Sequence, residues 1–164
     1  MNWENALGGA IEVSIAIAGF AGIVAAFNRR SEGAWAATDQ MLLEMLLASS
    51  VAACAFAFLP FVLLDALDDH AAWRIGSGLQ VLWLIGITVF RTRQSRRTGA
   101  EYFKSARFAA PLGLPAMLLL IGNATMWGTS WPYVVGVLFL IAVGFSAFIT
   151  LLLGVSGSKV SANE

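Results

Sequence analysis

Five long apolar stretches, separated by short polar segments, follow one another along the chain. A helix needs about 20 mostly apolar residues to cross the roughly 30 Å hydrocarbon layer of a bilayer. The pattern therefore predicts five transmembrane helices, at about residues 6–27, 41–67, 73–90, 108–127 and 132–154. The fourth stretch contains Pro111, Gly113 and Pro115. All three lie in its first turns, where proline is tolerated best, so we retain it as a helix.

Composition points to a single integral-membrane domain covering residues 1–164. Hydrophobic residues make up 59% of the chain and charged residues 12%, against about 45–50% and about 25% in soluble domains. A soluble domain this apolar could not cover itself with polar surface. Ten Lys and Arg balance ten Asp and Glu, so the basic excess of a nucleic-acid-binding protein is absent. We predict an all-α membrane protein, a bundle of five transmembrane helices whose first partner is the lipid bilayer.

The distribution of Lys and Arg predicts the orientation, because these residues concentrate in cytoplasmic loops. With five helices, nine of the ten fall on one side, and only Arg74 falls on the other. We therefore predict an outside N-terminus and an inside C-terminus, in a bacterial inner (plasma) membrane. The outer interface would then carry a belt of aromatic residues, namely Trp3, Trp73, Trp127, Trp131 and Tyr133.

Small residues recur at every fourth position of the first helix. They are Ala6, Ala10, Ser14, Ala18, Gly22 and Ala26. Such a ridge lets another helix approach closely. The residues on the opposite side of this helix, around Glu12, are small as well. We therefore expect the first helix to be buried within the bundle or between the bundle and a partner, which is either a second copy or another membrane protein.

Three polar residues fall at similar depths in three predicted helices: Glu12, Gln80 and Asn123. A carboxylate at mid-bilayer costs about 2.5–3.5 kcal/mol on insertion scales, so Glu12 should face protein or water. One interpretation is a polar layer that passes protons or cations. The other is structural, with a protonated Glu12 bonded to an amide of a neighbouring helix.

Charged residues also gather at the predicted helix ends. Glu44 lies in the first turn of the second helix, where Arg29, Arg30 and Arg107 could form an ion pair or a gate with it. Asp65, Asp68 and Asp69 have the i, i+3, i+4 spacing of one helix face. They form either a solvated acidic end or a mouth that concentrates cations. The basic loop 91–107 sets the topology or binds anionic lipid headgroups.

No catalytic constellation is visible. One histidine and one cysteine exclude a Cys/His metal centre within the chain, so we expect no enzyme activity, no metal and no cofactor. The leading expectation is a channel or transporter subunit for protons, cations or a small solute. The alternative is an accessory or assembly subunit of a larger membrane complex, and a membrane-embedded sensor is a third possibility.

Overall fold

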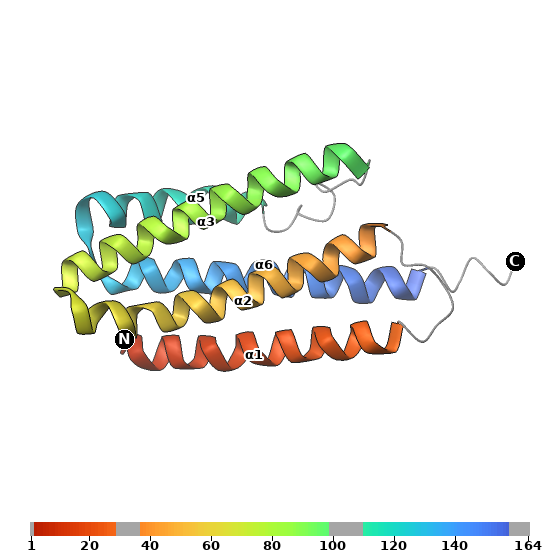
Figure 1. Cartoon of the computed structure of the whole chain (residues 1–164), viewed down its shortest axis with the longest axis horizontal. Helices are drawn as coiled ribbons and strands as arrows, with labels where there is room; N and C mark the ends of the chain where they lie inside the picture. The colour runs from red at the N-terminus through yellow and green to blue at the C-terminus, as the bar shows by residue number, and fades with distance from the viewer. Residues whose placement is uncertain (1, 29–36, 99–109, 158–164) are drawn as a thin grey trace, which may run out of the picture.

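The computed structural model describes residues 2–28, 37–98 and 110–157, which fold into an all-helical bundle (Figure 1). Its elements are α1 (Trp3–Asn28), α2 (Ala37–Ala66), α3 (Asp69–Thr98), α5 (Ala110–Gly122), the π-helical turn η1 (Asn123–Trp127) and α6 (Ser130–Gly157). Each predicted helix has a counterpart at nearly the same position. The all-helical fold class is therefore confirmed.

Four of the helices are long and apolar enough to cross a membrane. Their candidate spans are Trp3–Ala26, Gln40–Ala66, Asp69–Gln94 and Ser130–Leu152. The fourth predicted stretch forms α5 and η1, whose apolar part, Leu112–Trp127, is shorter. Pro115 lies inside α5 without ending it. As the sixth residue of α5 it lies beyond the first turn, so it removes one backbone hydrogen bond of the helix.

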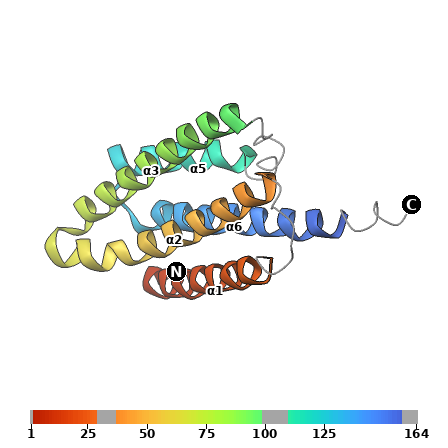
Figure 2. The same cartoon turned by 45° about the vertical axis from the view of Figure 1, so that its right-hand side comes forward.

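The helices form three layers, with α2 and α6 in the middle (Figures 1 and 2). Helix α1 packs on one side of this pair, and α3 and α5 pack on the other. One end of the bundle, here called the tryptophan end, carries four tryptophans. The ring of Trp3 contacts that of Trp73, and the ring of Trp127 contacts that of Trp131. The opposite end, here the arginine end, carries Arg91. Helix α3 leans away from α2 toward the arginine end (Figure 1).

Only one face of α1 packs against the bundle, and it does not follow the predicted ridge. Its buried positions are Leu7, Ala10, Ser14 and Ala21, with Ile17 and Val24 partly buried between and after them. This is spacing of three and four residues, which stays on one side of a helix. Residues four apart differ by one full turn plus about 40° around the helix axis. The predicted ridge therefore winds away from the face that packs against the bundle. Its last members, Gly22 and Ala26, are exposed.

The remaining helices approach each other closely where glycine meets a neighbour. A Cβ atom on Gly144 of α6 would lie 2.7 Å from the Ser49 hydroxyl of α2. A Cβ atom on Gly136 would lie 2.8 Å from a methyl group of Leu120 and closer still to the Gln80 side chain. These glycines allow α6 to pack tightly against α2, α3 and α5.

Candidate functional site

Asn123 is the centre of a buried polar cluster between α3 and the start of α6. Its amide nitrogen donates to the Ser77 hydroxyl at 2.8 Å and to the Thr129 carbonyl at 2.9 Å. Its amide oxygen accepts from the Thr129 backbone N–H at 2.9 Å and from the Thr129 hydroxyl at 3.3 Å. The side chain is fully buried. Because Asn123 is bonded through both amide atoms, this cluster fastens η1 to α3 and to the turn before α6.

Arg74 and Gly128 complete this connection at the tryptophan end. Arg74 donates from Nε to the Ala124 carbonyl at 3.0 Å and from Nη2 to the Thr125 carbonyl. These carbonyls belong to the π-helical turn. Gly128 ends the turn in the left-handed conformation, with φ +60°, and donates its N–H to the Asn123 carbonyl at 3.0 Å. The one basic residue predicted on this side is thus part of the α3–η1 packing.

Gln80 lies one turn further along α3 from Ser77 and is also buried. Its amide is close to the Tyr133 hydroxyl, but that hydroxyl donates to the Phe56 carbonyl at 2.6 Å. Neither amide atom of Gln80 forms a hydrogen bond of ordinary geometry with the described part of the chain. Apart from this contact with the Tyr133 hydroxyl, the Gln80 amide has no hydrogen-bond partner in the described part of the chain.

Glu12 lies apart from Gln80 and Asn123. It is exposed on α1, and α1 packs on the opposite side of the α2–α6 pair from α3 and η1. Within one chain, the structure therefore brings Gln80 and Asn123 to the same interface but leaves Glu12 outside it. The residues beside Glu12 are small, and a Cβ atom added at Gly9 or Gly19 would meet nothing within 4 Å.

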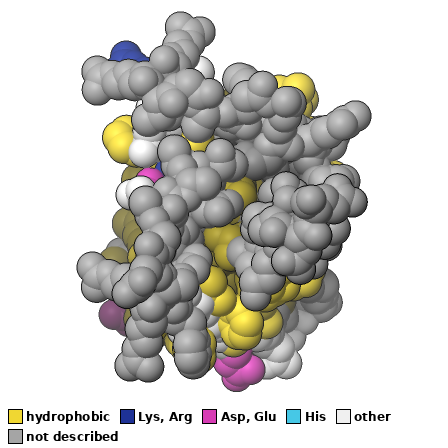
Figure 3. Space-filling model, turned by 90° about the vertical axis from the view of Figure 1, so that its right-hand side faces the viewer, with side chains coloured by type: hydrophobic (Ala, Val, Ile, Leu, Met, Phe, Trp, Pro, Cys, Tyr) yellow, Lys and Arg dark blue, Asp and Glu magenta, His cyan; other side chains and the backbone are white. Residues whose placement is uncertain are grey.

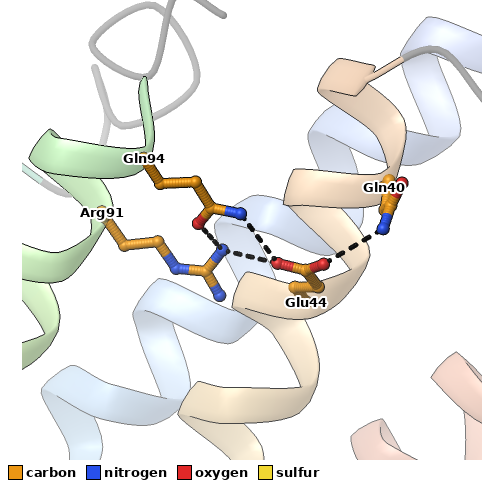
Figure 4. A network of polar contacts seen from close by, with 4 residues as sticks. All are labelled: Gln40, Glu44, Arg91 and Gln94. Atoms are coloured by element: carbon orange, nitrogen blue, oxygen red, sulfur yellow. Dashed lines mark hydrogen bonds and ion pairs between the residues drawn. The ribbon is translucent and has the colours of Figure 1, made fainter. Parts of the chain in front are cut away.

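At the arginine end, Glu44 and Arg91 link α2 to α3 (Figure 4). Arg91 donates from Nη1 to Glu44 Oε2 at 3.0 Å and to Gln94 Oε1 at 3.2 Å. Glu44 also accepts from Gln94 at 3.5 Å and from Gln40 at 3.3 Å. The ion pair that the sequence suggested for Glu44 therefore has Arg91 as its partner. Arg29, Arg30 and Arg107 lie outside the described residues.

The two partners of this ion pair differ in exposure. The Arg91 side chain is 4% exposed and the Glu44 side chain 41%. A cavity of about 50 Å³ adjoins Arg91 between α2, α3 and α6, and its other lining side chains are apolar except for Ser49. Figure 3, which looks onto the arginine end, shows hydrophobic side chains over most of the described surface and few charged ones.

The acidic residues of the tryptophan end do not share one helix face, so the predicted spacing argument is wrong. Helix α2 ends at Ala66 and α3 begins at Asp69, because Asp68 caps α3 by accepting the Ala71 N–H at 3.1 Å. Asp65, Asp68 and Asp69 are all exposed. Among the described residues, no three acidic, histidine or cysteine side chains are grouped to hold a metal ion.

Sequence reasoning missed the residues that complete both polar clusters. The sequence pattern places Arg91 in the basic loop, because the third apolar stretch ends at Phe90, whereas α3 continues to Thr98. Ser77, Thr129 and Tyr133 are ordinary polar residues in or beside apolar stretches. Only the arrangement of helices shows which backbone and side-chain atoms they meet.

Comparisons of the chain with family models, curated proteins and solved structures find no match.

Proposed function

We propose that this chain is a membrane assembly subunit that associates with a second copy of itself through the outward face of α1. This outer α1 face consists of Gly9, Glu12, Ala16, Gly19 and Ile23, which are exposed in the described chain. Of the two functions expected from the sequence, the assembly role has the stronger geometric support. The association would be the basis of a larger membrane complex.

The exposure of Glu12 carries this proposal. Glu12 follows Trp3 by about 14 Å along α1 at 1.5 Å per residue, which places it near the middle of a bilayer. A carboxyl group facing lipid there costs about 2.5–3.5 kcal/mol. A second helix would remove that cost by covering the group, and the small residues beside it permit close approach. In a two-fold dimer the same face serves both copies, so each copy would cover the Glu12 side chain of the other.

The same proposal includes five membrane crossings, with the N-terminus outside and the C-terminus inside. Helix α5 and η1 comprise 13 and 5 residues, or 18 in total, which is about 27 Å of helix. This length is close to the roughly 30 Å of a hydrocarbon layer. The arginine end then faces the cytoplasm, as the positive-inside rule requires, and a bacterial plasma membrane is the proposed location.

Self-association is tested by energy transfer between donor- and acceptor-labelled chains in proteoliposomes at increasing lipid dilution. Gly19→Leu would fill the outer α1 face, and we expect it to abolish energy transfer. Gly86→Leu is the matched control, because Gly86 is equally exposed and open but lies on α3; it should behave like the parent. Energy transfer that is absent in the parent, or equal in all three chains, contradicts the proposed interface.

A transport function remains the second candidate, favoured by the exposed carboxyl group of Glu12 on an apolar helix. In this case Glu12 would line a path between copies. Proton and cation flux in the same proteoliposomes tests it, with Glu12→Gln beside the parent. Flux in the parent that is lost in Glu12→Gln while energy transfer persists supports transport, and the absence of flux supports assembly alone.

A further inference from the structure

Arg91 is buried without using all of its donors. Its side chain is 4% exposed, and Nη1 makes the bonds to Glu44 and Gln94. The Nε–H is buried and has no acceptor among the described residues. An unpaired donor on a buried charged group is costly, so an acceptor at this position would be bound favourably.

The acceptors at this end are already engaged. Glu44 receives bonds from Arg91, Gln94 and Gln40, and it lies on the more exposed side of the pair. The Ser49 hydroxyl in the cavity wall donates to the Leu46 carbonyl at 3.1 Å of its own helix. Arg91 lines the cavity and brings positive charge to its wall, and its Nε–H has no acceptor in the described part of the chain; both favour an anionic oxygen beside it.

The cavity beside Arg91 defines the size and the surroundings of such a group. It measures about 50 Å³, whereas one water needs roughly 10–15 Å³, so it holds a few waters or one carboxylate or phosphate group. Most of its walls are apolar, and they include Trp83, Leu84 and Ile87 of α3. Trp83 is also 39% exposed, so this wall of the cavity borders the outer surface of the bundle.

We propose that Arg91 and this cavity bind the anionic group of an amphiphile, a carboxylate or phosphate attached to an apolar chain. The charged oxygens would accept from Arg91, and the chain would leave past Trp83 along the exposed apolar surface of α3, where Val89 and Phe90 lie. Basic pockets between helices at the cytoplasmic end are suited to anionic headgroups. This proposal rests on membrane insertion and is independent of the outer α1 face.

Binding is measured by native mass spectrometry of the full chain in nonionic detergent, titrated with phosphatidylglycerol. Arg91→Gln should weaken binding by about tenfold or more, which corresponds to about 1.4 kcal/mol. Arg93→Gln is the matched control, since Arg93 lies two residues away and is exposed; its affinity should stay within about twofold of the parent, because exposed charges contribute little. Equal affinity in the parent and Arg91→Gln overturns the proposal.

A second pair of variants separates ligand binding from helix packing. Glu44→Gln removes the competing carboxylate, so phosphatidylglycerol affinity should stay or rise. If it falls as far as in Arg91→Gln, the ion pair only holds α2 to α3 and the proposal fails. Arg91→Lys keeps the charge but removes the Nε donor, so this variant should bind phosphatidylglycerol more weakly than the parent. It provides the test if Arg91→Gln does not fold. Unchanged binding in Arg91→Lys also contradicts the proposed contact.

Three further compounds, oleate, phosphatidylcholine and inorganic phosphate, identify the source of the anionic group. Phosphatidylglycerol binding with no oleate binding indicates a lipid phosphate, and binding of both indicates any anionic amphiphile. Both results support the proposal if phosphatidylcholine and inorganic phosphate bind much more weakly. Inorganic phosphate binding as tightly as phosphatidylglycerol would show that the apolar chain contributes nothing, and would overturn the amphiphile assignment.

Discussion

Asn123 is a polar side chain in an apolar stretch, and its surroundings explain why it is tolerated there. Its two amide atoms make four hydrogen bonds, to Ser77 and Thr129. A buried amide with all its partners costs little, whereas removing it leaves those partners unpaired. In the described chain its role is therefore the connection of α3, η1 and α6.

Asn123→Ala should lower the free energy of unfolding by about 1–3 kcal/mol, because the Thr129 N–H and the Ser77 hydroxyl lose their partners. Unfolding by SDS in mixed micelles, followed by circular dichroism, measures this loss. Thr125→Val is the control, since the Thr125 hydroxyl is exposed and bonds only to carbonyls of its own helix; its effect should stay within about 0.5 kcal/mol. Equal losses in the two variants would contradict the connecting role of Asn123.

At the scale of helices, small residues matter only where another helix reaches them. Gly136 faces Gln80 and Leu120, while a Cβ atom on Gly78 of α3 would meet nothing within 4 Å. Both are glycines inside long helices, and the sequence pattern treats them alike. The difference arises from which face of each helix turns toward the bundle.

Gly136→Ala should lower the free energy of unfolding by about 1–3 kcal/mol, because the added methyl group overpacks the contact between α3, α5 and α6. Gly78→Ala should be neutral or stabilise by up to about 1 kcal/mol, since alanine is the better helix former and open space surrounds it. The same SDS unfolding measures both. A Gly136→Ala variant as stable as Gly78→Ala would show that α6 does not pack this closely.

At the scale of the whole molecule, the two ends of the bundle differ in chemistry. Tryptophans and exposed acids gather at one end, and Arg91 and Arg93 lie at the other. The proposed orientation places the arginine end in the cytoplasm because positive loops are retained there. Gln40, near the start of α2, and Leu67, just beyond its end, are both exposed, which allows a matched test.

We expect Leu67→Cys to react with a membrane-impermeant maleimide in intact cells, and Gln40→Cys to react only after the cells are permeabilised. Both substitutions are made in a Cys54→Ser background, since Cys54 is the single native cysteine. Labelling of denatured protein confirms that both cysteines are present and reactive. The reverse pattern would invert the proposed topology, and labelling of both positions in intact cells would exclude a membrane crossing by α2.

The sequence by itself determined the helical class and the approximate position of each helix that the structure describes. Long apolar runs can satisfy their backbone hydrogen bonds in a lipid environment only as helices or closed barrels, and their length is typical of helices. It also indicated that Glu12, Glu44, Gln80 and Asn123 are unusual, because polar groups in apolar stretches are costly.

Tertiary structure alone decided which of these residues meet. The spacing of apolar residues and the depth of a residue in the membrane place that residue along its own helix. They do not show how the helix is rotated about its axis or which helices lie beside it. Helix α1 packs through positions spaced by three and four residues, so Glu12 is turned outward. The extension of α3 to Thr98 places Arg91 beside Glu44, and the turn at Gly128 brings Thr129 to Asn123. These contacts depend on packing between distant segments, which no local pattern encodes.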